Sequence, residues 1–362
     1  MKALILAGGL ATRLRPLSCT RPKILFPVLN VPLLQWTFER LARNRIDEVI
    51  LAVNRQTEAS INQHRTPRYG LRVKYSRDPF RKPLGSGGPI KKAEKLLGHD
   101  APFLALNGDI FAEVDYLELS KRHREEEAVA TITLTRVKDP SRYGVAELTS
   151  NNQITRFIEK PSKKEAPSNL INAGVYMLSP KIFDYIPKGK TVSIERDVFT
   201  GLAKEGKLYG YVFDGLWSDI GKPEDYFRIN KVLLDSPQQR ERKTFEGVEI
   251  KAPVAIDKGV AIGEDSVVGP NAVLGRNVTG GFNVHIRNSI ILPETVISDF
   301  SSINQAIIGD SVKIGKNVKI SRGCIVGDYA KIEENVTLAE GVMICPGKEV
   351  SKSVLTPASK CR

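Results

Sequence analysis

The sequence predicts two domains of different class: an α/β domain with a mostly parallel sheet, followed by a coil of short β-strands. Strand and helix patterns alternate over the first two thirds of the chain, and an aliphatic residue then recurs every six positions. The excess positive charge is confined to the first part. We therefore expect the 362 residues to divide into an α/β domain, a polar linker, a repeat domain and a tail, at 1–234, 235–247, 248–352 and 353–362.

Short apolar runs that end in glycine or polar turns predict the strands of the first domain, and amphipathic runs predict its helices. The expected strands are Lys2–Leu6, Glu48–Val53 and Phe103–Leu106, and the expected helices are Leu33–Arg45 and Ile90–Leu97. In parallel sheets of this kind, ligands bind at the carboxyl ends of the strands. The turns that follow Leu6 and Leu106 lie at such ends.

The second part has a period of six, which neither a helix nor a single strand produces. A first register of aliphatic residues is Ile250, Ile256, Ile262, Val268, Leu274, Ile286 and Leu292. A second register, which we expect to be offset by an insertion, is Ile308, Ile314, Ile320, Val326, Ile332, Leu338, Ile344 and Val350. A coil with three short strands per turn explains this period, because each six-residue side directs one aliphatic residue inward.

The charge distribution narrows the choice of partner. The chain has 54 Lys and Arg and 41 Asp and Glu, a formal charge of +13. Residues 248–362 hold 13 basic and 12 acidic residues, so 41 basic and 29 acidic residues, a net +12, precede them. Aromatic residues make up only 7%, and none alternates with lysines as a stacking platform for bases. We therefore expect a small polyanion as partner, and no nucleic acid.

The sequence also lacks the usual signals for membranes and secretion. No run of about 18 apolar residues is present, and Met1 leads into the first strand without a signal peptide. The four cysteines form no CxxC pair, which argues against a zinc site or a disulfide framework. We expect a cytoplasmic protein with no membrane partner.

A glycine turn, Ala7-Gly8-Gly9, directly follows the first strand. Successive backbone N–H groups in such a turn can converge on a phosphate, and Arg13 and Lys23 add positive charge nearby. Alone, the pattern is equally typical of a tight turn on a basic surface. It matches neither the Walker A pattern nor GxGxxG.

Taken whole, Leu6–Pro32 (LAGGLATRLRPLSCTRPKILFPVLNVP) resembles the signature segment of the sugar nucleotidyltransferases. Ala11 stands where that family usually has glycine, and alanine enters positive φ only at a cost of about 1 kcal/mol. Further segments resemble the family's motifs in the same order: Pro83–Pro89, Leu106–Asp109, Tyr143–Val145, Phe157–Pro161, Ile171–Tyr176 and Trp217–Gly221. The resemblance implies a Rossmann-like nucleotidyltransferase domain and a left-handed β-helix of hexapeptide repeats.

The resemblance also implies a role for individual residues. Asp109 and Asp219 would hold Mg²⁺, and Arg13 and Lys23 would act in catalysis by stabilising charge on the α-phosphate and the departing pyrophosphate. Lys160 would neutralise the phosphate of the sugar. The other residues expected to bind substrate are Leu6, Ala7, Gly8, Gly9, Thr12, Gly85, Gly88, Gly108, Gly144, Glu159 and Asn172.

The reaction implied is transfer of a nucleotidyl group from a nucleoside triphosphate to a sugar 1-phosphate, with release of pyrophosphate. It needs no general base, because the attacking phosphate is already an anion, and none of the four histidines lies in a motif. The loop at Pro83–Pro89 and the repeat domain that follows are most similar to the members of this family that use GTP and mannose 1-phosphate. Thymidylyl or uridylyl transfer to glucose 1-phosphate remains an alternative, and so does a regulatory subunit without catalysis.

The β-helix presents flat coils and an exposed end, surfaces that commonly pack against copies of themselves. We therefore expect a homo-oligomer that forms through the repeat domain.

Overall fold

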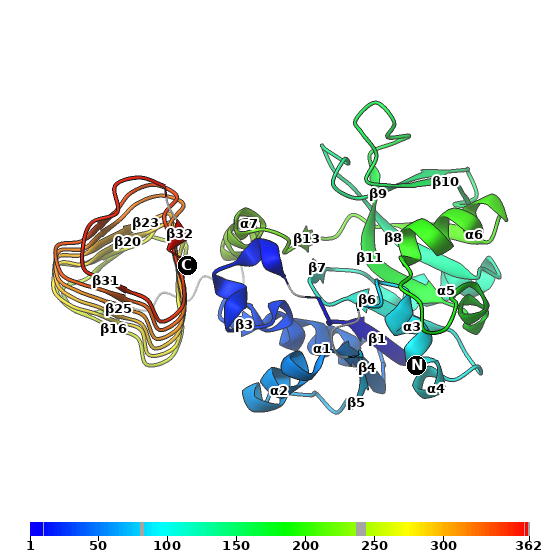
Figure 1. Cartoon of the computed structure of the whole chain (residues 1–362), viewed down its shortest axis with the longest axis horizontal. Helices are drawn as coiled ribbons and strands as arrows, with labels where there is room; N and C mark the ends of the chain where they lie inside the picture. Colours follow the sequence, from blue (N-terminus) through cyan, green and yellow to red (C-terminus); the bar gives the residue numbers. More distant parts are fainter. Residues whose placement is uncertain (10, 80–82, 237–243, 358, 361–362) are drawn as a thin grey trace. The chain divides into compact units, whose positions relative to one another are not determined.

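The structure is a computed structural model that describes residues 1–9, 11–79, 83–236, 244–357 and 359–360 (Figure 1). Residues 237–243 of the expected linker, and 358, 361 and 362 of the expected tail, lie outside the described residues. Contacts divide the chain into two compact units. The first comprises Met1–Gly9, Lys23–Leu25 and Leu33–Asp219, and the second comprises Leu10–Pro22, Phe26–Pro32 and Ile220–Arg362.

The first unit contains a nine-stranded sheet whose parallel half has the order β6-β1-β4-β5. These strands are β1 (Lys2–Leu6), β4 (Glu48–Val53), β5 (Arg72–Arg77) and β6 (Phe103–Asn107), which confirms the three predicted strands. The other half is largely antiparallel and comprises β8 (Ala130–Arg136), β9 (Gly144–Leu148), β10 (Ile154–Glu159), β11 (Leu170–Leu178) and β12 (Leu208–Val212). A separate ribbon pairs β7 (Ile110–Ala112) with β13 (Trp217–Asp219).

Helices cover both faces of this sheet, because side chains alternate along each strand. In β1, Leu4 joins one buried apolar cluster while Ala3 and Ile5 join another. The first cluster includes side chains of α3 (Gly88–Lys92), α4 (Glu94–Leu97) and α6 (Thr200–Lys204). The second includes side chains of α1 (Leu33–Arg43), α2 (Arg55–His64) and α5 (Tyr116–Glu125). This is the predicted α/β class.

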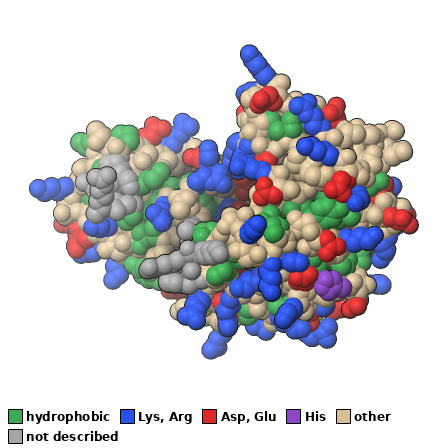
Figure 2. Space-filling view, turned by 45° about the vertical axis from the view of Figure 1, so that its right-hand side comes forward, with side chains coloured by type: hydrophobic (Ala, Val, Ile, Leu, Met, Phe, Trp, Pro, Cys, Tyr) green, Lys and Arg blue, Asp and Glu red, His purple; other side chains and the backbone are tan. Residues whose placement is uncertain are grey.

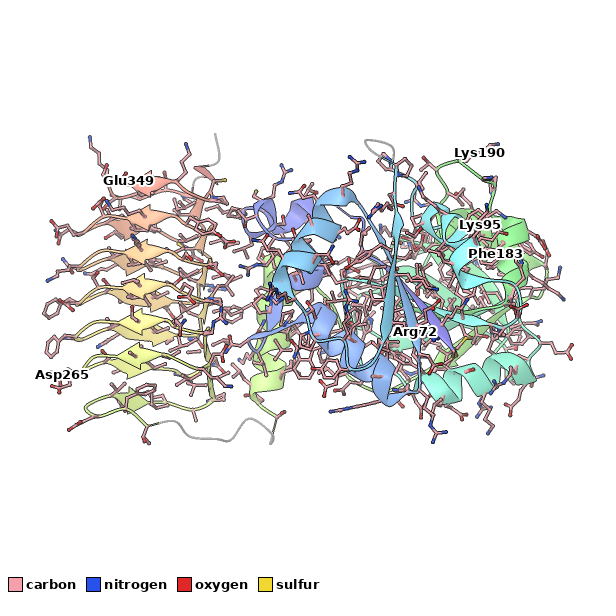
Figure 3. The ribbon with its side chains drawn as sticks, turned by 90° about the horizontal axis from the view of Figure 1, so that it is seen from below. Arg72, Lys95, Phe183, Lys190, Asp265 and Glu349 are labelled. Atoms are coloured by element: carbon pink, nitrogen blue, oxygen red, sulfur yellow. The ribbon has the colours of Figure 1, made fainter. Side chains whose placement is uncertain are left out.

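The second unit contains three parallel sheets of two- or three-residue strands, the arrangement expected of the left-handed β-helix. One sheet comprises β14 (Glu249–Ile250), β17 (Val267–Val268), β20 (His285–Arg287), β23 (Ser302–Asn304), β26 (Lys319–Ile320) and β29 (Thr337–Leu338). A second comprises β15 (Val254–Ile256), β18 (Ala272–Leu274), β21 (Ile290–Ile291), β24 (Ile307–Ile308), β27 (Ile325–Val326), β30 (Met343–Ile344) and β32 (Ser359–Lys360). The third comprises β16 (Ala261–Ile262), β19 (Thr279–Gly280), β22 (Val296–Ile297), β25 (Lys313–Ile314), β28 (Lys331–Ile332) and β31 (Glu349–Val350). Figure 1 shows the three sides of this coil, and Figure 3 shows its stacked turns, with Asp265 and Glu349 near opposite ends.

The two aliphatic registers are related by short turns, and the expected insertion is wrong. Strand partners are 18 residues apart between Val267 and His285 but 17 apart between Val273 and Ile290. The core positions step by five residues, not six, from Ile286 to Ile291 and again from Ile303 to Ile308. Ile291, rather than the predicted Leu292, therefore belongs to the apolar cluster inside the coil.

Two N-terminal segments belong to the second unit and are held there by α7 (Pro223–Leu234) and by the β-helix. The hairpin β2 (Pro27–Val28)–β3 (Val31–Pro32) receives a 2.6 Å hydrogen bond from the Tyr226 hydroxyl to the Pro27 carbonyl. The Asn30 side chain donates to the carbonyl of Leu274 at 2.9 Å. The sequence motif around Leu6–Pro32 is therefore shared between the two units.

Two further observations concern cysteines and membranes. Cys345 is disulfide-bonded, whereas Cys19 and Cys324 are free thiols. The sequence argues against a disulfide framework, and spacing along the chain could not reveal the bond at Cys345, because pairing depends on distance in the folded chain. Among the described residues, no helix is long and apolar enough to cross a membrane.

Candidate active site

Two turns meet at the carboxyl edge of the parallel strands in the first unit. β1 and β6 are neighbours, with Leu6 opposite Asn107, and the N–H of Gly108 donates to the Leu6 carbonyl at 2.9 Å. A Cβ at Gly108 would lie 2.8 Å from that carbonyl oxygen, so only glycine fits this approach. The structure thus places the start of the predicted glycine turn against Gly108, the residue before Asp109.

Asp109 and Asp219 also come together, around the ammonium of Lys23. The Lys23 Nζ lies 2.5 Å from Asp109 Oδ2 and 3.8 Å from Asp219 Oδ1. The β7–β13 ribbon explains this approach, because it places Asp219 opposite Ile110, the residue after Asp109. The Lys23 side chain is 12% exposed, so its charge faces the two carboxylates with little screening by water.

This donor set fits a divalent cation. One positive group already lies within 4 Å of an oxygen from each carboxylate, which shows that both side chains can address the same cation. Among the described residues, no group of three or more His, Cys, Asp or Glu side chains is placed to hold a metal. Two carboxylates are sufficient for a divalent ion that takes its remaining ligands from substrate phosphates and water.

The glycine turn has polar neighbours that the sequence analysis missed. Ala7 donates its N–H to the Ala52 carbonyl at 2.8 Å, and the Asn54 side chain donates to the Gly8 carbonyl at 3.2 Å. A Cβ at Gly8 would lie 2.6 Å from the Asp78 carboxylate, whereas Gly9 has no such neighbour within 4 Å. Partial burial raises the pKa of Asp78. Asn54 follows β4, and Asp78 follows β5. Their position at the carboxyl edge of the sheet is the only feature of the sequence that could have identified them as neighbours of the turn.

A second group of predicted residues lies where β9 begins and β10 ends. Gly144 pairs with Glu159, and a Cβ at Gly144 would lie 2.8 Å from the Glu159 carboxylate. The Lys160 ammonium lies 3.5 Å from Glu159 Oε1, and its side chain is 58% exposed, so it is available to an anion. Lys160 has φ 52°, the left-handed region, which turns the chain immediately after β10.

The loop at Leu84–Gly88 packs on the segment that begins at Thr191. Gly85 has φ 73°, and a Cβ there would lie 2.2 Å from the Val192 carbonyl oxygen, so the loop requires glycine. A Cβ at Gly88 would lie 2.6 Å from the Leu84 side chain. Residues 80–82, which precede this loop, lie outside the described residues.

Glu195 connects this loop to the group around Glu159 and was missed by the sequence analysis. Its carboxylate accepts hydrogen bonds from Ser86 Oγ at 2.5 Å and Ser193 Oγ at 2.7 Å. Burial raises the pKa of Glu159, and the nearby charge of Glu195 raises it further, while Lys160 opposes the shift. Ser86 and Glu195 are 109 residues apart, so no local motif could have paired them.

This raised pKa predicts a pH-dependent cost to stability. A carboxyl group whose pKa is higher in the folded chain stabilises the fold below its unfolded pKa and loses that contribution as pH rises through the folded pKa. Glu159→Gln removes the partly buried charge, so we expect its melting temperature to exceed the wild-type value by a few degrees at pH 7.5 and to match it near pH 4. Calorimetry at the two pH values measures this, and equal melting temperatures at pH 7.5 would contradict it.

Asn172 lies on β11 and has partners of its own. Its side chain donates to the Tyr176 hydroxyl at 3.1 Å and accepts from the Gly174 N–H at 2.9 Å. The nearby Trp217 indole N–H donates to the Ala173 carbonyl at 2.9 Å, and its ring meets Tyr143 edge to face. These contacts join the predicted segments around Tyr143, Asn172 and Trp217 in one part of the first unit.

Thr12 and Arg13 lie in the second unit, in a 3₁₀ turn, Thr12–Leu14. Ala11, which precedes this turn, has φ 47° and ψ 39°, the left-handed region in which the family's glycine is unstrained. Its carbonyl accepts from the Leu14 N–H at 3.0 Å and from Ser18 Oγ at 2.8 Å. The alanine therefore adopts the backbone conformation of a glycine loop despite its side chain.

Charged side chains elsewhere follow no single pattern. Figure 2 shows Lys and Arg side chains spread over the visible face and interspersed with Asp and Glu.

His123 is buried between Thr131 Oγ1 at 2.9 Å and Ser179 Oγ at 3.1 Å, and burial lowers its pKa to about 4. Its imidazole is a neutral structural group at physiological pH.

Comparison with known proteins agrees with this geometry. A family model described as nucleotidyl transferase matches residues 2–236, and one described as the GMPPB C-terminal domain matches residues 250–359. The chain is 38% identical over 263 residues to a mannose-1-phosphate guanyltransferase of Saccharomyces cerevisiae, which covers 71% of this chain and 72% of that one. It is 34% identical over 361 residues to mannose-1-phosphate guanylyltransferase 1 of Arabidopsis thaliana, covering 99% of both chains.

Among solved structures, HddC from Yersinia pseudotuberculosis is similar in fold and 28% identical in sequence, with a TM-score of 0.55. The match covers 64% of this chain and 99% of that one. The family model spans the glycine turn, both aspartates and the two groups of residues described above, and the relatives extend the similarity through the repeats. The chain therefore belongs to the nucleotidyl transferase family.

Proposed function

We propose that this chain is a mannose-1-phosphate guanylyltransferase, which joins GTP and mannose 1-phosphate into GDP-mannose and releases pyrophosphate. The relatives of that name, one of them similar over 99% of both chains, carry this proposal. An oxygen of the sugar phosphate attacks the α-phosphorus of GTP, a new P–O bond forms, and the bond to the β-phosphate oxygen breaks. The electron pair leaves with pyrophosphate, and no proton needs to be removed from the attacking group.

The reaction brings two anions together, so its catalysis depends mainly on positive charge and orientation. In our proposal, Lys23 and Arg13 stabilise charge on the α-phosphate and the leaving pyrophosphate. Lys160 neutralises the sugar phosphate, and Gly144, Glu159 and Asn172 bind the sugar hydroxyls. The exposed ammonium of Lys160 beside the partly buried Glu159 supports this division, because one group can meet a phosphate and the other a hydroxyl.

Members of this family generally use a divalent metal ion, and we propose Mg²⁺ held by Asp109 and Asp219. When bound, the ion neutralises phosphate oxygens and stabilises the charge that develops on them. The residues of the chain then orient the substrates: Gly8 and Gly9 offer backbone N–H groups, since the N–H of Ala7 is donated to the Ala52 carbonyl. Gly108 lets this turn lie close to the loop that carries Asp109.

The choice of substrate gives the first test of this proposal. We expect pyrophosphate release from GTP with mannose 1-phosphate to exceed, by about tenfold or more, release from dTTP or UTP with glucose 1-phosphate. An assay of four triphosphates against a panel of sugar 1-phosphates measures this. A preference for dTTP or UTP would replace the guanylyl assignment with the thymidylyl or uridylyl alternative and leave the reaction class intact. No release with any pair would favour a regulatory subunit.

We also propose self-association through the β-helix and a cytoplasmic location. The exposed rings of Phe282 and Phe300 support the first, because they lie on successive turns of the coil with their centroids 5.6 Å apart. The free thiols of Cys19 and Cys324 agree with the second, whereas the disulfide of Cys345 does not add to it.

A further inference from the structure

Asp328, in the β-helix, has a buried carboxylate directed at the N-terminal segment of the second unit. The residue is 3% exposed, which is rare for an aspartate without specific partners. Its Oδ1 accepts the N–H of Asp310 at 2.8 Å, a contact between successive turns of the coil. Its Oδ2 accepts Thr20 Oγ1 at 2.6 Å and lies 3.6 Å from the guanidinium of Arg21. One carboxylate oxygen of Asp328 thus binds within the coil, and the other contacts residues 20 and 21.

Asp310 completes this contact from the preceding turn of the coil. Its Oδ2 accepts Arg21 Nη2 at 3.2 Å, and its Oδ1 accepts Ser311 Oγ at 2.7 Å. The Arg21 side chain is 18% exposed and lies against two carboxylates that are 23% and 4% exposed. Such a partly buried charge network loses stability when any one partner is removed.

The anchored residues end the loop that carries Arg13. Thr20 follows the 3₁₀ turn Leu17–Cys19, and its hydroxyl also lies 3.4 Å from the Leu17 carbonyl. Ser18 in that turn donates to the Ala11 carbonyl, which in turn accepts the N–H of Leu14. Within the second unit, Asp328 therefore holds Thr20, and the short stretch of chain before Thr20 is in turn hydrogen-bonded through Ser18 to the turn of Arg13.

We propose that Asp310 and Asp328 are positioning residues for nucleotidyl transfer: they hold Thr20 and Arg21, and so fix the loop that presents Arg13 to the triphosphate. This inference rests on the proposed function, because it assigns the β-helix a part in that reaction. The β-helix would then have a role in catalysis within one chain, separate from any self-association.

Asp299 offers a matched control in the same coil. Its Oδ1 accepts the N–H of Phe282 at 3.0 Å, the same link between turns that Asp328 makes with Asp310. Its ion-pair partner, Lys316 at 3.2 Å, also belongs to the β-helix. Asp299→Ala therefore removes a comparable contact within the coil and leaves the anchor of residues 20 and 21 in place.

The test compares full-length Asp328→Ala, Arg21→Ala, their double variant and Asp299→Ala in the pyrophosphate-release assay. We expect kcat to fall about tenfold or more in each single variant at the anchor, with KM for mannose 1-phosphate changed less than about threefold. The double variant should be no slower than the slower single variant, because both changes break one contact. Asp299→Ala should keep kcat within about twofold of wild type. Arg21→Ala leaves the coil unaltered, so it tests the proposal even where Asp328→Ala folds poorly.

A second measurement does not depend on catalysis. Hydrogen exchange of backbone amides in residues 11–20 should be faster in Asp328→Ala and Arg21→Ala than in wild type, and unchanged in Asp299→Ala. Exchange as slow as in wild type in the anchor variants would overturn the proposal. So would a wild-type kcat in a variant whose residues 11–20 exchange faster. A wild-type chain that is inactive with GTP and mannose 1-phosphate would refute the proposed function, whereas the exchange result would still decide whether the two aspartates hold this loop.

Discussion

Asp109→Asn is expected to lower turnover by at least about 100-fold while the chain stays folded. Asparagine keeps the shape of the side chain but loses the charge that faces Lys23 at 2.5 Å, and with it an anionic oxygen for the metal. The side chain is 37% exposed, so folding does not depend on its burial. Pyrophosphate release at saturating GTP, mannose 1-phosphate and Mg²⁺ measures the loss, and thermal unfolding checks that the fold is intact.

Asp100→Asn is a suitable control for this variant. Asp100 is exposed and lies outside every motif, so the same chemical change should leave turnover within about twofold of wild type. Wild-type turnover in Asp109→Asn would remove Asp109 from the proposed metal site. A loss in both variants would indicate a general effect of altered charge rather than a specific one.

Order along the chain identified the motifs of this site but did not show how they meet. Asp109 and Asp219 could each be predicted from a motif. Their approach, however, depends on a ribbon of two three-residue strands, β7 and β13, which are too short to show a periodic pattern. Glu195 has no motif in the sequence analysis, and only the packed loop at Leu84–Gly88 brings it to Ser86. Long-range packing decides both cases, and a single sequence carries no signal for it.

For the fold, as for the site, the overall pattern could be predicted from the sequence and its details could not. Alternation of strand and helix, and the period of six, were sufficient for both fold classes because each pattern repeats many times. Single departures from a pattern were not visible: a five-residue step moves the core position to Ile291, and either Ile291 or Leu292 satisfies an aliphatic pattern equally well. The predicted helix Ile90–Leu97 is two short helices, α3 and α4, which meet at Ala93.

The division of the N-terminal motif between two units was also beyond the reach of the sequence. The family's signature segment is continuous in the chain, yet Lys23–Leu25 belongs to the first unit and the residues on either side belong to the second. Arg21 and Asp310 are 289 residues apart, so their ion pair becomes visible only when the coil is built. A contiguous motif is therefore no evidence that all its residues are held by the same part of the fold.

Lys23→Gln should separate the role of the lysine from that of the aspartates, because its two effects have opposite signs. The ammonium stabilises negative charge in the reaction, so we expect turnover to fall by about 100-fold or more. The same ammonium competes with a metal ion for Asp109 and Asp219, since it lies within 4 Å of both. Removal of that competitor should tighten the binding of a divalent ion to the free enzyme, whereas Asp109→Asn should weaken it.

Mn²⁺ binding followed by electron paramagnetic resonance in the absence of substrates measures this second effect without any turnover. We expect the dissociation constant for Mn²⁺ to fall several-fold in Lys23→Gln and to rise in Asp109→Asn. Lys23→Arg is the matched control: it keeps the positive charge, so it should bind Mn²⁺ about as wild type does, although a wider and planar group positions that charge differently. Weaker Mn²⁺ binding in Lys23→Gln would mean that the lysine organises the two carboxylates for the metal rather than competing with it, because repulsion between Asp109 and Asp219 would then separate them.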